Sequence, residues 1–336
     1  AVDTMTRLST STDDPALRVE LLHRTGRILA QHLGDAGGAE QRFLQALALD
    51  GSHVPTMKAT TELYMARGDW HKAANMMVEA EQHSPIPTEK VRLLTEAAQI
   101  YQSRLEDHPR AAGYYAAALA IDPEHVPAGE PLADIYYQAR RFEELDAIMD
   151  MLVRKTAPTK KGEEARDLFF RAASCAAELG KHDKALKLFK AAYDVDSRHL
   201  PTLLGRAAVQ FQVKDWDGAG KIYQTVLVQH RDALKEADVV DVYYRLGQVR
   251  LMLGEQRKAL NMFEKALEID AGHRSTLLAV IELQTQQGDF GAVIHAKRSL
   301  LESADAEEKF RLLEEIGDIY HERLQNPQKA ISTYME

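Results

Sequence analysis

Small and apolar residues return along this chain in a fixed order. An alanine is followed four positions later by an aromatic residue or methionine, and three positions after that by another alanine, or a close variant of this pattern occurs. The pattern begins at Ala1, Ala39, Ala73, Ala111, Leu145, Ala185, Ala219, Ala259, Val293 and Ala330. Successive spacings are 38, 34, 38, 34, 40, 34, 40, 34 and 37 residues. A period in the thirties is typical of a repeat array, and the alternation indicates a duplicated block of two repeats, about 72 to 74 residues long.

Each repeat contains two segments whose apolar residues recur at the spacing of an α-helix. In the clearest repeat, the first predicted helix ends at Gly254 and the second carries Ala259 and Phe263 on one face. Gly247 and Ala259 are expected to let the two backbones approach closely, and Phe263 to fill the gap between neighbouring hairpins. Because one hairpin cannot bury its apolar face alone, the hairpins are predicted to stack.

These positions resemble the tetratricopeptide repeat, which carries an aromatic residue and Leu-Gly on its first helix and alanine, an aromatic residue, alanine and proline on its second. The matching residues are Leu246, Gly247, Ala259, Phe263 and Ala266, then Ala111, Tyr115, Ala118 and Pro123, then Ala185, Phe189 and Ala192. The resemblance covers essentially the whole chain. It implies an all-α, right-handed α-solenoid of about nine helix-turn-helix repeats, without strands.

The repeat phase gives a domain organisation. We expect a single solenoid over residues 1–336, excised from a longer array, because 1–12 reads as the second helix of an incomplete repeat and 306–336 as another incomplete repeat. The repeats expected between them are residues 15–51, 52–85, 86–123, 124–157, 158–197, 198–231, 232–271 and 272–305. The basic segment 154–162 is the best candidate for a flexible joint.

Apolar residues near the two ends have no predicted neighbours. They are Met5 and Leu8 at the start of the chain and Ile331 and Tyr334 at its end. Since large exposed apolar patches drive association, we expect end-to-end self-association or fraying of the terminal helices.

Composition narrows the classes of function. The chain is 45% hydrophobic and 28% charged, with a net charge of −9. This balance argues against a nucleic-acid partner, which needs a basic face. No apolar run approaches the roughly 18 residues of a membrane span, so membrane insertion is not expected. The single cysteine, Cys175, reads as a small buried residue and is compatible with a cytoplasmic location, which is favoured, or a periplasmic one.

Four histidines recur in phase, in an Asp-x-x-His pattern. The pairs are Asp50 and His53, Asp122 and His125, Asp196 and His199, and Asp270 and His273. Neighbouring histidines are expected on the order of 20 Å apart from the packing of successive helices, too far for one metal ion, so we interpret them as loop or cap residues. No catalytic or phosphate-binding motif is present, and neither an enzyme nor a cofactor is expected.

The resemblance implies that the first helix of each repeat lines a concave groove that binds partners. The groove candidates are Tyr137, Phe170, Arg171, Phe211, Tyr244 and Arg245, with Arg206 as a secondary candidate. Family members that grip a C-terminal carboxylate have asparagines where this chain has Ser174 and Gln248. The alternative for Arg171 and Arg245 is local pairing with an aspartate four residues earlier.

The function hypothesis is a non-catalytic protein-interaction scaffold that binds a protein or an acidic and hydrophobic peptide, extended or helical, in this groove. Two alternatives stay open at this point. One is the regulatory or substrate-recruiting arm of a larger enzyme, and the other is a structural spacer in an envelope or secretion assembly.

Overall fold

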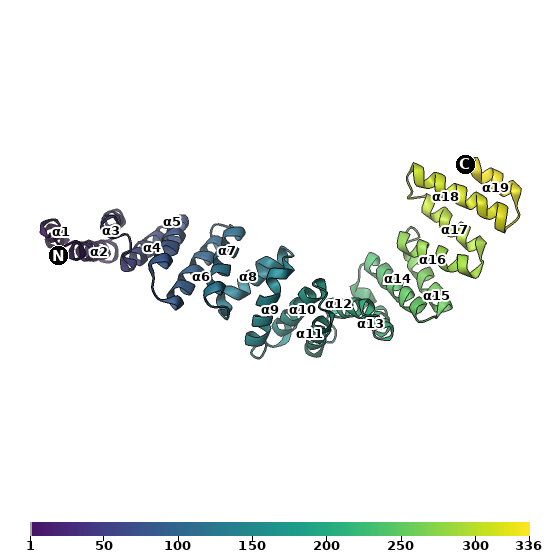
Figure 1. Ribbon diagram of the computed structural model, residues 1–336, viewed down its shortest axis with the longest axis horizontal. Helices are drawn as coiled ribbons and strands as arrows, with labels where there is room; N and C mark the ends of the chain where they lie inside the picture. The colour runs from purple at the N-terminus through teal and green to yellow at the C-terminus, as the bar shows by residue number, and fades with distance from the viewer. Residues whose placement is uncertain (1) are drawn as a thin grey trace. The chain divides into compact units, whose positions relative to one another are not determined.

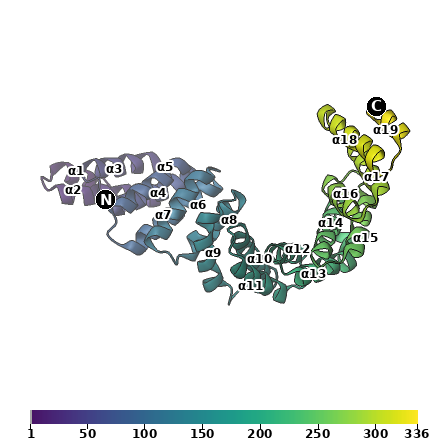
Figure 2. The same cartoon turned by 45° about the vertical axis from the view of Figure 1, so that its right-hand side comes forward.

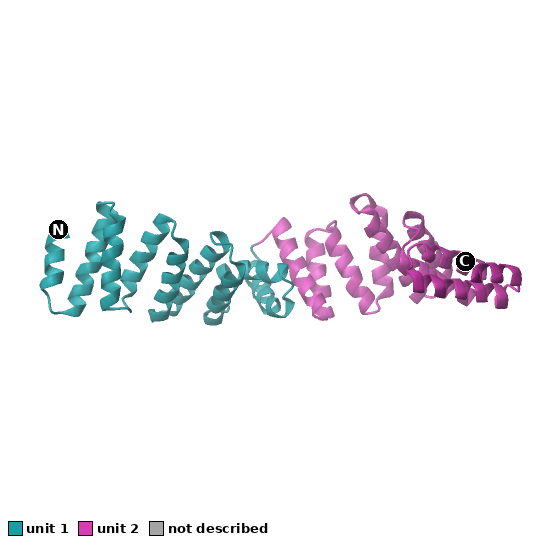
Figure 3. Ribbon diagram, turned by 90° about the horizontal axis from the view of Figure 1, so that it is seen from above, with its two compact units in different colours: residues 1–159 teal, residues 160–336 magenta. Residues whose placement is uncertain are grey.

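The computed structural model describes residues 2–336, so Ala1, the first of the ten pattern positions, lies outside the described residues. Every regular element in the described range is a helix, and no strand occurs there. The chain divides into two compact units, Ala1–Thr159 and Lys160–Glu336, which Figure 3 colours separately. The boundary between the units falls inside the basic segment 154–162.

Unit 1 contains nine helices within its described residues. They are α1 (Val2–Ser11), α2 (Pro15–His32), α3 (Ala36–Leu49), α4 (Val54–Arg67), α5 (Trp70–His83), α6 (Pro87–Ser103), α7 (His108–Ile121), α8 (Val126–Gln138) and α9 (Phe142–Thr156).

Unit 2 contains ten α-helices and two short helical segments. The α-helices are α10 (Gly162–Glu178), α11 (His182–Val195), α12 (Leu200–Gln212), α13 (Trp216–Gln229), α14 (Glu236–Met252), α15 (Gln256–Ile269), α16 (Arg274–Gln287), α17 (Phe290–Leu301), α18 (Ala306–Asp318) and α19 (Pro327–Tyr334). The short segments are the 3₁₀ turn η1 (Arg231–Ala233) and the π-helical segment η2 (Ile319–Arg323).

Within each unit, every helix packs against the helix before it and the helix after it, as Figures 1 and 2 show. From α2 onwards the helices form nine hairpins in the described chain, α2–α3 through α18–α19. We call the first helix of each hairpin helix A and the second helix B. The prediction of an all-helical array of about nine helix-turn-helix repeats is confirmed.

The repeating alanines and aromatic residues of helix B form the core. On α15, Ala259, Phe263 and Ala266 have no exposed surface, and the corresponding residues of α3, α7 and α11 are buried to the same degree. Small side chains on both sides of one ring let the ring sit between neighbouring helices at high packing density. The sequence pattern therefore marks the buried face of helix B.

One residue in each hairpin turn adopts a left-handed backbone conformation. These residues are Gly34, Gly68, Glu106, Arg140, Gly180, Lys214, Gly254, Gly288 and Gln325. Glycine enters this region without steric cost, whereas a side chain at Lys214, with φ of 64°, meets its own backbone. The tight turn sets the antiparallel pairing of the two helices.

The apolar residues predicted to be uncovered near the two ends are largely exposed. Leu8, Ile331 and Tyr334 are exposed and Met5 is half-buried. Self-association through these side chains stays a prediction, which sedimentation velocity over a concentration series can test. None of the helices described in residues 2–336 combines the length and the apolar character that a membrane span requires.

Candidate functional site

The predicted groove residues divide between the two units. Tyr137 lies on α8 of unit 1. On the A helices of unit 2 lie Phe170, Arg171, Phe211, Tyr244 and Arg245. The predicted residues that share one unit therefore lie on α10, α12 and α14.

Tyr137 and Phe211 pack across the turns of their own hairpins. The Tyr137 ring meets Phe142 edge-on with centroids 6.2 Å apart, and the Phe211 ring meets Trp216 edge-on at 5.0 Å. Phe142 and Trp216 are the first residues of α9 and α13, so these contacts tie the start of helix B to the end of helix A. The guanidinium of Arg245 lies 5.7 Å from the Phe211 centroid, which links α14 to α12 by a cation–π contact.

Phe170 belongs to a junction of three rings between consecutive hairpins. Its centroid lies 6.2 Å from that of Phe189 on α11 and 5.3 Å from that of His199. His199 precedes α12 as its N-cap residue. The Phe170 ring is half-buried by these contacts, so it holds two hairpins together.

Tyr244 takes the position of Phe170 in an equivalent three-ring junction, one two-repeat block further along the chain. Its ring lies 6.1 Å from Phe263 on α15 and 5.7 Å from His273, the N-cap residue of α16. A third copy of this ring junction lies in unit 1, where His23 takes the position of Tyr244, and its ring contacts those of Phe43 and His53. The junction therefore returns with the two-repeat period seen in the sequence.

The phased histidines stand at the N-cap positions of α4, α8, α12 and α16, in line with the loop or cap interpretation, but none of their side chains hydrogen-bonds a backbone amide of the helix that follows. His53, His199 and His273 each place Nδ1 2.7 Å from the hydroxyl of the threonine three residues later, Thr56, Thr202 or Thr276. Such a contact fixes the ring over the first turn of the next helix A. Within residues 2–336, no group of three His, Cys, Asp or Glu side chains is placed to hold a metal ion.

Burial and a nearby cation change the electrostatics of one cap. Burial lowers the pKa of the His199 imidazole, and the positive charge of Arg166 lowers it further. Arg166 also donates to Asp196 at 3.2 Å and to Asp167 at 2.9 Å. Hydrogen bonds from the Arg198 amide and from Arg166 lower the pKa of the Asp196 carboxyl.

The arginine candidates sit in different surroundings. Arg171 is half-buried on α10, and Arg206 lies over the Tyr193 ring of the preceding helix B, 5.7 Å from its centroid. Arg245 is exposed. Asp241, the aspartate expected beside it, lies 3.6 Å from Nε2 of His273. The exposed guanidinium of Arg245 is thus the predicted cation most accessible to a ligand.

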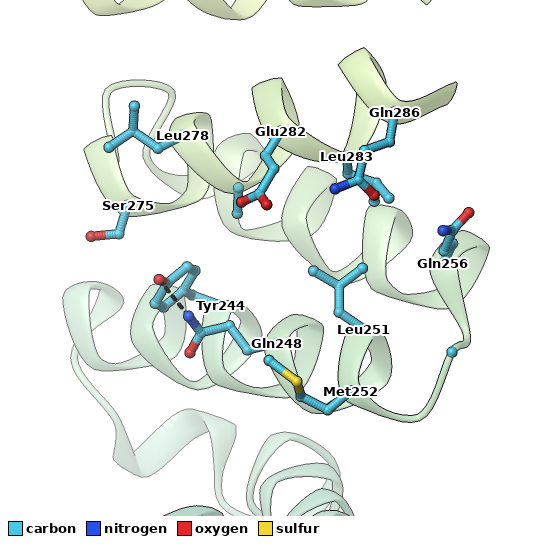
Figure 4. A pocket seen from close by; sticks show the side chains of 12 residues that line it. Tyr244, Gln248, Leu251, Met252, Gln256, Ser275, Leu278, Glu282, Leu283 and Gln286 are labelled. Carbon is cyan, nitrogen blue, oxygen red and sulfur yellow. Dashed lines mark hydrogen bonds between the residues drawn. The ribbon is translucent and has the colours of Figure 1, made fainter. Parts of the chain in front are cut away.

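A cleft opens between the A helices α14 and α16, with a volume of about 520 Å³ (Figure 4). We call it the helix-A cleft. Its lining residues are Tyr244, Gln248, Leu251, Met252, Gly254, Gln256, Ser275, Leu278, Ala279, Glu282, Leu283 and Gln286. The volume lies in the range of ligand pockets, about 300 to 1,000 Å³. Of the six predicted groove residues, Tyr244 is the one that lines it.

The helix-A cleft combines apolar walls with side-chain amides. Met252 and Leu278 are 59% and 48% exposed, although both are apolar. Gln248 donates through Nε2 to the Tyr244 hydroxyl at 2.6 Å, while its Oε1 is buried and has no hydrogen-bond partner in the described chain. Glu282 extends from α16 into the space between the helices and supplies the cleft's one acidic side chain (Figure 4). This set can hold an apolar side chain and pair with backbone amides.

Sequence reasoning missed the α16 side of this cleft. Ser275, Leu278, Glu282 and Gln286 are spaced three and four residues apart, and so they share one face of α16. That spacing, with an exposed leucine in the middle, is the signal that could have found the face. The search for aromatic and arginine residues passed over it.

Two stretches of the chain match models of the tetratricopeptide repeat, residues 167–199 and 199–271. They cover the hairpins that hold the Phe170 and Tyr244 junctions. Residues 167–271 therefore consist of tetratricopeptide repeats. Repeats of this kind support a role as a protein-interaction scaffold.

Similar proteins are distant. Protein CTR9 homolog from Arabidopsis thaliana is 25% identical over 270 residues, which cover 76% of this chain but 23% of that protein. Among solved structures, YrrB, described as a tetratricopeptide-repeat protein with an unusual peptide-binding site, is 19% identical with a TM-score of 0.46 over 62% of this chain and 97% of its own. The Cut9–Hcn1 complex is 12% identical with a TM-score of 0.42, covering 93% of this chain and 66% of that chain.

Proposed function

We propose that this chain is a non-catalytic scaffold that binds a peptide segment of a partner protein along the A helices of unit 2. The observation that carries the proposal is the helix-A cleft, where the exposed apolar side chains of Met252 and Leu278 lie beside polar ones. Exposed apolar side chains grouped beside polar ones are typical of interaction surfaces.

The lining residues support an extended ligand. Met252 and Leu278 flank the cleft and would contact one bulky apolar side chain of the peptide. Gln256 and Gln286 offer both donors and acceptors, which suit the alternating backbone groups of an extended strand. Arg245, next to Tyr244 in sequence and exposed, would take an acidic residue of the ligand, whereas Glu282 disfavours one inside the cleft.

A selection from a random peptide library against the full chain tests this proposal. We expect the selected peptides to share an apolar residue and to bind the double variant Met252→Glu, Leu278→Glu at least ~10-fold more weakly, since buried apolar contacts dominate such interfaces. Because both residues are exposed, the variant should keep its helicity. Val195→Glu, a substitution at an exposed valine on α11 outside the cleft, is the matched control. Equal binding to wild type and the double variant would remove the helix-A cleft as the site.

A second pair of variants tests the predicted groove residues. Tyr244→Phe removes the hydroxyl that Gln248 contacts and keeps the ring that packs on Phe263. If Tyr244 acts in binding, this variant weakens the selected peptides and leaves the urea midpoint near that of wild type. Arg171→Ala with Arg245→Ala should weaken acidic peptides more than neutral ones. Unchanged affinities in both variants would make these residues structural only.

A further inference from the structure

A second cleft lies on the other side of α14, where α13 and α15 pack against it. Its volume is about 410 Å³, and all its lining residues belong to unit 2. Figure 1 shows α13, α14 and α15 in succession. None of the groove residues predicted from the sequence lines this cleft, and the helix-A cleft uses different residues of α14.

The lining of this cleft is positively charged, although the chain as a whole has a net charge of −9. We call it the basic cleft. Its cationic lining residues are Arg250, Arg257, Lys258 and Lys265, and no aspartate or glutamate is among its lining residues. Three of these cations, Arg257, Lys258 and Lys265, belong to α15. The acidic side chains of α15, Glu264 and Glu268, line a different surface, which α15 shares with α16 and α17. The positive charge is therefore confined to one side of α15.

Neutralisation within the chain is incomplete. Glu255 accepts from Arg250 at 2.8 Å and from Lys258 at 2.7 Å, so one carboxylate serves two cations. The described residues contain no ion pair for Arg257 or Lys265. Lys265 instead lies over the Tyr243 ring, 6.0 Å from its centroid. Two cations at the cleft are thus available to an external carboxylate.

The same cleft has an apolar floor. Leu227, Val228, Tyr243, Leu246 and Met262 contribute to its lining. Val228 is 75% exposed although its side chain is apolar. A site with cations around exposed apolar surface fits a ligand that carries both carboxylates and a bulky apolar side chain.

We propose that the basic cleft is a second docking site, which binds an acidic peptide segment of a partner protein with an apolar residue between its carboxylates. The carboxylates pair with Arg257 and Lys265, and the apolar side chain covers Val228 and Leu227. Nucleic acid fits less well, because phosphate tracking needs an extended basic face rather than a short cleft on an acidic protein. This site is separate from the helix-A cleft and stands or falls independently of it.

The test uses the full chain and a fluorescein-labelled peptide of roughly 12 residues, rich in glutamate and aspartate with a central Leu-Phe pair. A second probe replaces each acidic residue by its amide. Fluorescence anisotropy should show the acidic probe binding more tightly than the amide probe, by ~10-fold or more at low salt. Arg257→Glu with Lys265→Glu should weaken the acidic probe by at least that factor.

Three further variants separate the effect of the cleft from that of net charge. Val228→Asp, at an exposed residue, should weaken the acidic probe without loss of helicity. Lys187→Glu with Lys190→Glu changes the net charge by the same amount on the exposed surface of α11 and should leave binding nearly unchanged. Met252→Glu with Leu278→Glu, which disrupts the helix-A cleft, should also leave it unchanged.

Several results would overturn the proposal. Equal weakening by the α11 control would show that net charge alone attracts the probe. Loss of binding in the Met252 and Leu278 variant would move the acidic peptide to the helix-A cleft. A single-stranded oligonucleotide that binds more tightly than the acidic probe, or equal affinity for the amide probe, would also exclude an acidic-peptide site.

Discussion

The hairpins α10–α11 and α14–α15 look alike in sequence, yet their central phenylalanines, Phe189 and Phe263, fit against glycines on different neighbouring helices. Phe263 lies against Gly247 of its own helix A, where an added Cβ would be 2.4 Å from its Cε1. Phe189 lies against Gly205 of the following helix A, where an added Cβ would be 2.6 Å from its Cζ. The glycine is thus inside the hairpin in one case and in the next hairpin in the other.

At the position where one hairpin has this glycine, the corresponding position beside the other ring holds an alanine. Ala173 stands on α10 where α14 has Gly247, and Ala279 stands on α16 where α12 has Gly205. Each ring contacts the aromatic residue of its own helix A, but it fits against a glycine of its own helix A in one hairpin and against a glycine of the next helix A in the other. The two packing modes therefore differ in which neighbouring helix leaves space for the ring.

The largest effect should come from removal of the rings. Phe189→Ala and Phe263→Ala should each lower the free energy of unfolding by about 3 to 5 kcal/mol, because each removes a fully buried ring and leaves a cavity. Urea titration followed by circular dichroism gives the size of the loss. Hydrogen exchange should then locate it, with α12 losing protection in the first variant and α14 in the second. The same pattern of exchange in both variants would contradict the two packing modes.

The glycine substitutions sharpen the comparison. Gly247→Ala and Gly205→Ala should each cost about 1 to 3 kcal/mol, because the new methyl group overlaps a buried ring. Phe263→Leu should recover part of the loss in Gly247→Ala but none of it in Gly205→Ala. Gly113→Ala, at a helical glycine with open space around it, is the control and should be neutral or stabilising. Recovery of both variants by the same substitution would show that the rings are not matched to separate glycines.

The cap of the α12 junction should make stability depend on pH. Folding lowers the pKa of His199 below its ordinary value of 6.5, so the unfolded chain binds more protons than the folded chain as the pH falls. Stability is therefore unaffected by this group above about pH 6.5 and falls as the pH decreases below it. His199→Asn places a residue that favours the N-cap position there and removes the titration. The difference between urea midpoints at pH 7.5 and pH 5 should be smaller in this variant than in wild type, and an equal difference would exclude the effect.

The smallest effect concerns the turns. Both compared hairpins turn at a glycine, Gly180 and Gly254, whereas α12–α13 between them turns at Lys214, with φ of 64°. Lys214→Gly should raise the free energy of unfolding by up to ~1 kcal/mol, because the strained conformation costs glycine little. Gly254→Lys should lower it by a similar amount. A thermal melt of each variant beside wild type measures both, and a loss of stability in Lys214→Gly would contradict the account of the turn.

The sequence predicted the helices well because their signals are local. Apolar spacing marked the buried face of helix B, and the Asp-x-x-His pattern marked the caps. The role of Phe170 was harder to predict, because its partners Phe189 and His199 are 19 and 29 residues away and only packing brings the three rings together. The helix-A cleft was predictable only in part: the spacing around Leu278 marks one face of α16, but only the placement of α14 beside α16 makes that face the wall of a cleft.

The position of the glycines limits how this array can be shortened or recombined. Excision of residues 200–273 would join His199 to Arg274 and would rebuild the His-x-x-Thr cap with Thr276. The new junction would nevertheless set Phe189 against Ala279, where that ring now has Gly205. Removal of a block of the right length is therefore not enough to preserve the packing. The shortened chain also needs a glycine against the Phe189 ring, so Ala279→Gly is the substitution that such a splice requires.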